Sequence, residues 1–146
     1  MNRQNITSFE QTIALAQDVS KILKPGSVIA LQGELGSGKT FLSKHIINSL
    51  LGSDINVTSP TFQLLQIYQA DGYDIYHYDL YRLKNRDEIF ELSIEDAMNG
   101  RNICIIEWPE IIFDILPKET LVIELGFEDN EVDKRYAICY PPSRNK

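Results

Sequence analysis

The stretch that decides the fold is Gly33-Glu34-Leu35-Gly36-Ser37-Gly38-Lys39-Thr40. It matches the pattern G-x-x-x-x-G-K-[ST], in which small residues let backbone N–H groups curve around a phosphate. Residues 28–32, which precede it, are apolar and β-branched and predict a strand. Apolar residues at helical spacing from 41 to 50 predict a helix after it. A strand, a glycine-rich loop and a helix in this order predict a site for a nucleoside triphosphate, with an ordinary glycine-rich turn as the alternative.

Each position of the loop has a chemical reason to be there. Lys39 is expected to reach the β- and γ-phosphate oxygens, and the Thr40 hydroxyl to bind Mg²⁺. The helix that begins next to them adds positive potential at its N-terminus. The small residues that would allow close approach of the backbone to the phosphates are Gly33, Gly36, Ser37 and Gly38.

A phosphate loop also needs an acidic residue on a neighbouring strand to position the metal. Residues 103–106 are apolar, as in a strand buried on both faces, and Glu107 follows them at the strand's carboxyl end. This is a Walker B pattern with Glu in place of the usual Asp, and we expect Glu107 to bind Mg²⁺ together with Thr40. Trp108 comes next and has two interpretations: a core or interface residue, or a shield between the phosphates and water.

Two further segments carry candidate residues. Residues 58–62 lie where a switch loop would sense the γ-phosphate, and Thr61 supplies the hydroxyl; a proline turn that opens a strand is the alternative. Residues 77–82 contain Asp79, which could hold a metal-bound water or act as a base, and Arg82, which could contact a phosphate or a partner. For the histidines, His45 and His77, we expect structural or exposed positions.

The remaining sequence predicts an α/β domain with a mostly parallel central sheet, flanking helices and one antiparallel hairpin. Capping boxes at 7–10 and 8–11 predict a helix over 10–23. Asp71-Gly72 is a turn signal between strands at 62–68 and 73–78. Other expected elements are one or two short amphipathic helices within 86–98 and strands at 102–107, 121–125 and 136–140. We expect one domain over 1–146, with a flexible tail at 140–146.

Composition narrows the class of protein. The 146 residues fit one domain at about 100–200 residues per domain. The net charge of −7 weighs against direct binding of nucleic acid through phosphate neutralisation. Positions 1–73 hold five basic and five acidic residues and positions 74–146 hold nine and sixteen, so the second half carries the whole excess. An acidic face there is interpreted either as a source of solubility or as a docking face for a basic partner.

Other features of the sequence point to a cytoplasmic protein. Residues 1–11 do not resemble a signal peptide, and no apolar run approaches the roughly 18 residues of a membrane span. Cys104 and Cys139 are not in a Cys-x-x-Cys pattern, so no redox or metal chemistry is assigned to them.

Four motifs together resemble the bacterial TsaE (YjeE) family, the small ATPase of tRNA threonylcarbamoyladenosine biosynthesis. They are the loop at 33–40, Ser-Pro-Thr at 59–61, Asp-Leu-Tyr-Arg-Leu at 79–83 and Glu-Trp-Pro at 107–109. The resemblance spans about residues 6 to 140. It implies that residues 36–41, which end at Phe41, wrap the phosphates of ATP, and that Asp79 and Trp108 contribute to hydrolysis. It also places Glu10 and Arg135 beside the nucleotide.

The resemblance implies partners as well. Family members act on a complex of TsaD-like and TsaB-like proteins that transfers the threonylcarbamoyl group to position 37 of tRNA. The chain is therefore expected to bind ATP and Mg²⁺, to hydrolyse ATP slowly when alone, and to reach tRNA only through that complex. Transfer itself is not expected of it.

Two other classes of protein use a phosphate loop. A small-molecule kinase would have an arginine-rich lid, whereas Lys and Arg are scattered over 111–146. A GTPase would have Asp-x-x-Gly and Asn-Lys-x-Asp motifs, and the sequence contains neither. Comparing free phosphate with phosphorylated products, and ATP with GTP, would separate the three classes.

Overall fold

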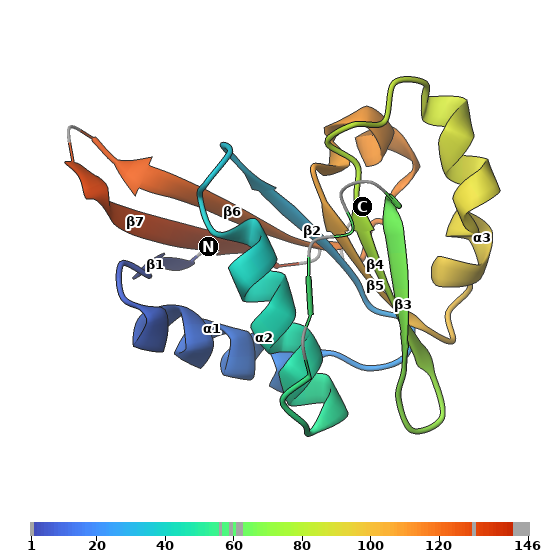
Figure 1. Ribbon diagram of the computed structural model, residues 1–146, viewed down its shortest axis with the longest axis horizontal. Helices are drawn as coiled ribbons and strands as arrows, with labels where there is room; N and C mark the ends of the chain where they lie inside the picture. Colours follow the sequence, from blue (N-terminus) through green and yellow to red (C-terminus); the bar gives the residue numbers. More distant parts are fainter. Residues whose placement is uncertain (1, 56, 59, 61–62, 130, 142–146) are drawn as a thin grey trace.

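One sheet organises the chain. The computed structural model describes residues 2–55, 57–58, 60, 63–129 and 131–141. Within these residues seven strands form a single sheet in the order β1-β7-β6-β2-β5-β4-β3 (Figure 1). The strands are β1 (Asn2–Asn5), β2 (Val28–Gly33), β3 (Leu65–Gln69), β4 (Asp74–Asp79), β5 (Ile103–Glu107), β6 (Leu121–Glu128) and β7 (Glu131–Tyr140).

The middle of the sheet is parallel and both sides are antiparallel. Strand β2 lies between β5 and β6 and is parallel to both, and β4 is parallel to β5. The β3–β4 hairpin closes one side, while β6, β7 and β1 pair antiparallel on the other. The predicted α/β class, with a mostly parallel centre and an antiparallel hairpin, is confirmed. The parallel arrangement brings the carboxyl ends of β2, β4 and β5 to one edge, where ligands collect in open α/β sheets.

Helices cover both faces of this sheet. Helix α1 (Phe9–Ile22) and helix α2 (Lys39–Leu51) lie side by side on one face (Figure 1). The 3-10 helix η1 (Arg86–Leu92) and the short helix α3 (Ile94–Ala97) pack on the other face. A second 3-10 helix, η2 (Pro109–Ile115), follows β5 directly.

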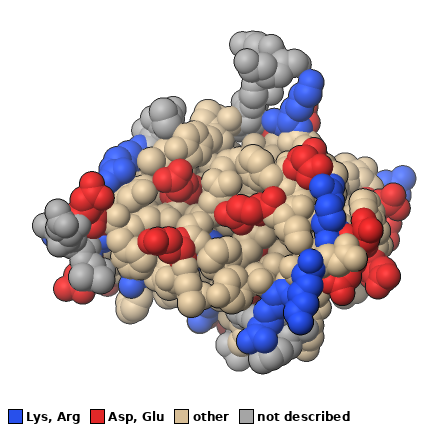
Figure 2. All heavy atoms as spheres, turned by 90° about the horizontal axis from the view of Figure 1, so that it is seen from above, with Lys and Arg blue, Asp and Glu red and all other residues tan. Residues whose placement is uncertain are grey.

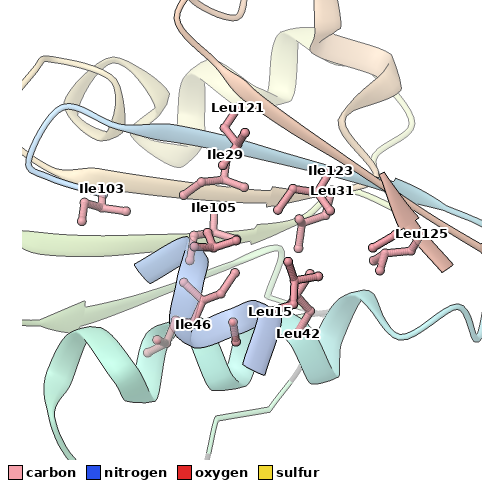
Figure 3. Packing of buried hydrophobic residues seen from close by; sticks show 14 of the residues in the cluster. Leu15, Ile29, Leu31, Leu42, Ile46, Ile103, Ile105, Leu121, Ile123 and Leu125 are labelled. Carbon is pink, nitrogen blue, oxygen red and sulfur yellow. The ribbon is translucent and has the colours of Figure 1, made fainter. Parts of the chain in front are cut away.

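The larger core lies between the sheet and the helices α1 and α2. Figure 3 shows side chains of the central strands, among them Ile29, Leu31 and Ile105, pointing toward Leu15 of α1 and Leu42 of α2. These five side chains are at most 2% exposed. Burial of apolar surface contributes about 25 cal/mol per Å², so this core holds α2, and with it the preceding loop, against the sheet.

Several elements differ from the sequence prediction. Strand β3 begins at Leu65 and not at 62, because Leu64 has a left-handed backbone (φ 66°) that ends the turn before the strand; residues 61 and 62 lie outside the described part. Within 86–98, Ser93 (φ 60°) separates η1 from α3, in agreement with the prediction of one or two short helices there. Strands β6 and β7 are longer than predicted, and β1 and η2 were not predicted.

Candidate functional site

The glycine-rich loop joins β2 to α2 at the carboxyl edge of the sheet. Gly33 ends the strand at φ 154°, and a Cβ atom there would lie 2.5 Å from the carbonyl oxygen of Leu125. Gly38 caps the N-terminus of α2 in the left-handed conformation, at φ 105°. Glycine is the residue type that adopts these conformations at little cost. The loop therefore takes its curved path because of its glycines, and it leaves the first backbone N–H groups of α2 directed toward the cleft.

Lys39 lies over this loop. Its Nζ atom donates hydrogen bonds to the carbonyl oxygens of Gly33 (2.6 Å) and Glu34 (3.0 Å). The same ammonium group lies 3.9 Å from the ring centroid of Trp108. Burial lowers the pKa of Lys39, and the charges of Glu107, Glu110 and Asp79 oppose this shift. The ammonium is thus held on neutral carbonyls and an aromatic face, close to where a phosphate would meet the loop.

A chain of hydrogen bonds runs from α2 to β4 through Glu107. The Thr40 hydroxyl donates to Glu107 Oε1 at 2.8 Å, and Glu107 Oε2 lies 2.6 Å from His77 Nε2. Glu107 is 1% exposed and His77 is fully buried. Both carboxylate oxygens are therefore engaged, which limits the cost of burying the charge.

Asp79 lies beside Glu107 because β4 and β5 pair in parallel with these two residues opposite each other. It is 5% exposed, and its Oδ1 atom accepts a hydrogen bond from the backbone N–H of Tyr81 at 3.1 Å. The parallel pairing thus places two carboxylates at adjacent strand ends, facing the cleft.

Trp108 turns the chain out of β5 with a left-handed backbone (φ 59°). Its indole packs against the Tyr81 ring, with centroids 4.7 Å apart, and receives the Lys39 ammonium on its face. Of the two interpretations open at the sequence level, the geometry supports a residue that lines the site and partly covers the lysine.

These residues enclose a cleft of about 490 Å³. Nine of the expected site residues line it: Gly36, Gly38, Lys39, Thr40, Phe41, Asp79, Arg82, Glu107 and Trp108. Gly33 and Ser37 do not: Gly33 lines a neighbouring cleft on the other side of Trp108, and Ser37 is fully buried.

Glu10 and Arg135, two other expected residues, do not line the cleft. Glu10 is exposed in the first turn of α1, although its neighbour Phe9 packs against Phe41 with ring centroids 4.9 Å apart. A guanidinium nitrogen of Arg135 lies 3.6 Å from where a Cβ atom of Gly38 would stand. Thr61 lies outside the described residues.

Three residues of the site had no assigned role in the sequence analysis. Leu35 and Tyr81 line the cleft and are 70% and 52% exposed. His77, expected to be structural or exposed, contacts Glu107 in the buried interior. Its position two residues before Asp79 on an alternating strand was the available signal, since both side chains then lie on one face.

The donor set fits Mg²⁺. Mg²⁺ prefers oxygen ligands and usually combines one or two protein oxygens with water and substrate phosphates. Thr40 keeps its oxygen lone pairs while donating its hydrogen to Glu107. Among the described residues no group of three or more His, Cys, Asp and Glu side chains could hold a metal by itself. Thr40 and Glu107 could thus supply protein oxygens to a Mg²⁺ ion whose other ligands are water and phosphate.

Figure 2 looks from above onto the side of the molecule where the loop lies. Acidic side chains occupy the middle of this face, and most of the visible Lys and Arg side chains lie toward its rim. Among the side chains coloured in this view, basic groups form no continuous surface. No described helix is long and apolar enough to cross a membrane.

Fold and site together define a single α/β domain in which a phosphate-loop-like turn joins the central parallel strand to a helix, with a carboxylate on the adjacent strand. Sequence comparison gives the family. The profile described as threonylcarbamoyl adenosine biosynthesis protein TsaE matches residues 6–137. The chain belongs to the TsaE family.

Individual relatives agree. A protein of Rickettsia conorii named tRNA threonylcarbamoyladenosine biosynthesis protein TsaE is 46% identical over 125 residues, covering 86% of this chain and 71% of that protein. The protein of the same name from Bacillus subtilis is 34% identical over 126 residues, covering 84% and 78%. The crystal structure of Bacillus subtilis YdiB superimposes with a TM-score of 0.76 at 27% identity, covering 97% of this chain and 86% of that one.

Proposed function

We propose that this protein is a Mg²⁺-dependent ATPase that serves the synthesis of N6-threonylcarbamoyladenosine at position 37 of tRNA. Family membership supports the pathway, and the names of the relatives support it as well. The observation that carries the proposed activity is the convergence of Lys39, Thr40 and Glu107 on one cleft. This is the arrangement that phosphate binding and metal positioning require.

In this proposal ATP binds with its phosphates along the loop. Lys39 would leave the Gly33 and Glu34 carbonyls to bind the β- and γ-phosphate oxygens. Backbone N–H groups around Gly36, Ser37 and Gly38 would donate to the same phosphates. For this the Ser37 N–H would leave the Glu34 carbonyl, to which it donates at 3.0 Å. Phe41 would border them at the start of α2. Farther out, Glu10, Arg135 and Thr61 are proposed to contact the nucleotide.

Thr40 and Glu107 would hold Mg²⁺, which neutralises phosphate charge when it is bound. Asp79, next to Glu107 in the register, would orient the water whose oxygen attacks the γ-phosphorus. Trp108 would cover Lys39 and the phosphates from solvent. Because one small domain supplies only part of a site, we expect slow hydrolysis by the isolated chain.

We propose that the protein acts in the cytoplasm on a TsaD/TsaB-type complex through protein contacts and does not transfer the threonylcarbamoyl group itself. The net charge of −7 supports contact with proteins over direct contact with tRNA. The acidic excess of residues 74–146 supports a docking role for that half.

The experiment that tests the proposal is reconstitution of tRNA modification with labelled ATP. Reactions contain TsaD/TsaB-type proteins, tRNA and threonylcarbamoyl-adenylate, with this chain, without it, or with its Lys39→Ala variant. We expect free phosphate and repeated modification of tRNA only with the parent chain, and a preference for ATP over GTP. A phosphorylated small molecule, or equal modification without the chain, would contradict the proposal.

A further inference from the structure

We infer that His77 is a positioning residue for Glu107: it holds one carboxylate oxygen so that the other faces Thr40 and the cleft. The inference rests on the proposed role of Glu107 at a Mg²⁺ site. It concerns a residue that does not line the cleft.

The first observation is burial. His77 is fully buried, and its Nε2 atom lies 2.6 Å from Glu107 Oε2. Because His77 and Glu107 are both buried, bulk water does not compete for this contact.

The second observation concerns the other ring nitrogen. Nδ1 of His77 is buried and has no hydrogen-bond partner among the described residues. A hydrogen on Nδ1 would be a buried donor without an acceptor, which costs about 1–3 kcal/mol. A carboxylate oxygen accepts hydrogen bonds, so the hydrogen of the 2.6 Å contact lies on Nε2 and is donated to Glu107. The geometry thus assigns His77 as the donor and Glu107 as the acceptor.

The third observation is that the two carboxylate oxygens of Glu107 have different hydrogen-bond partners. Oε2 is taken by His77 inside the protein, and Oε1 accepts from Thr40 at 2.8 Å. Two donors at opposite ends of a carboxylate fix the rotation of its plane. A metal or metal-bound water in the cleft would therefore meet Oε1. Residues that orient metal ligands in this manner contribute about 10- to 100-fold to metal affinity or activity.

The test compares His77→Leu with His77→Gln, because the amide nitrogen of Gln can take the place of Nε2 as a donor. The matched control is Tyr78→Phe at the next residue of β4. It removes the partly buried hydrogen bond from the Tyr78 hydroxyl to the Leu92 carbonyl at 2.7 Å. Tyr78 belongs to the core on the opposite face of the sheet. The Tyr78→Phe variant therefore shows what weakening β4 does to Mg²⁺ affinity when the contacts of Glu107 are left intact.

Two affinities are measured by calorimetry: that of Mg²⁺ for the protein with ADP, and that of ADP in the presence of EDTA. We expect His77→Leu to weaken Mg²⁺ binding about 10- to 100-fold while ADP binding in EDTA stays unchanged. His77→Gln should recover most of the Mg²⁺ affinity, and Tyr78→Phe should match the parent protein. Equal Mg²⁺ affinity in His77→Leu and the parent, or no recovery in His77→Gln, would overturn the inference.

Nitrogen NMR of the parent protein provides a second measurement, which stands even if His77→Leu does not fold. We expect the His77 ring to carry its hydrogen on Nε2, and a hydrogen on Nδ1 alone would overturn the inference. Failure of the parent protein to bind ADP and Mg²⁺ would instead refute the proposed function, and the inference with it. The two failures are therefore distinguishable.

Discussion

Glu107 shows how much of the site depends on one side chain. Its oxygens join Thr40 of α2 to His77 of β4, and its charge opposes the lowering of the Lys39 pKa. Because it is 1% exposed, the carboxylate has little water to replace a lost partner. Substitutions of Glu107 should therefore lower the rate of ATP hydrolysis more than they lower the affinity for ATP.

Replacing Glu107 with Gln tests this expectation. The amide keeps the shape of the side chain but removes the charge that would attract Mg²⁺. We expect hydrolysis of ATP to fall on the order of 10²-fold, while ATP affinity in EDTA stays near that of the parent. Phosphate release and calorimetry measure the two quantities. The control is Glu95→Gln, an exposed carboxylate of α3. An unchanged hydrolysis rate in Glu107→Gln would remove Glu107 from the proposed metal site.

The fluorescence of Trp108 can report a movement of the Lys39 ammonium. It is the one tryptophan of the sequence, and its ring faces the Lys39 ammonium at 3.9 Å. Binding of phosphates should draw the ammonium away from the ring and change the fluorescence of Trp108. We expect ADP to produce this change in the parent and not in Lys39→Ala. Constant emission at ADP concentrations that calorimetry shows to be saturating would contradict this movement of Lys39.

At the scale of elements, the start of α1 illustrates what local sequence determines. Ser8 accepts from the backbone N–H of Gln11, and the Gln11 side chain accepts from the backbone N–H of Ser8, as the capping box predicted. We expect Ser8→Ala to lower the free energy of unfolding by about 0.5–2 kcal/mol in urea denaturation. Ser49→Ala, an exposed position within α2, is the control and should be neutral or slightly stabilising. Equal effects at both positions would argue against the cap.

The burial of strand β5 predicts that the Cys104 thiol is unreactive in the folded protein. Burial raises the pKa of the Cys104 thiol, and no part of this residue is exposed. The pKa of Cys139 is raised too, but that residue is only partly buried. At pH 8 we expect maleimide to modify Cys139 slowly and to modify Cys104 only after unfolding in urea, as measured by mass spectrometry of peptides. Rapid modification of Cys104 in the folded protein would contradict a buried β5.

Elements with a local signal were predictable from the sequence, and those fixed by tertiary contacts were not. The capping box, the glycine-rich loop and the apolar run of β5 identified α1, the β2–α2 unit and the metal carboxylate candidate. Strand β1 consists of polar residues, and it forms by pairing with the edge of β7 that β6 leaves open. The contact of His77 with Glu107 depends on β4 lying next to β5, and sequence spacing does not specify this neighbour.

At the scale of the whole molecule, charge and fold both support the proposed action through protein contacts. The parallel centre of the sheet brings the loop, Asp79 and Glu107 to one edge, and Leu35 and Tyr81 remain exposed at the rim of the cleft. Acidic side chains occupy the middle of the face seen in Figure 2. The domain of 146 residues thus combines the cleft that we propose to bind a nucleotide with an acidic centre on the face seen in Figure 2.

The affinity for ATP in Lys39→Ala tests the central claim most directly. Calorimetry compares the parent, Lys39→Ala and the control Lys44→Ala, which changes a lysine of the same helix that does not line the cleft. Loss of a hydrogen bond to a charged group costs about 1.5–3 kcal/mol, so the account predicts ATP binding weakened about 10- to 100-fold in Lys39→Ala and unchanged in Lys44→Ala. Parental affinity for ATP in Lys39→Ala would contradict it.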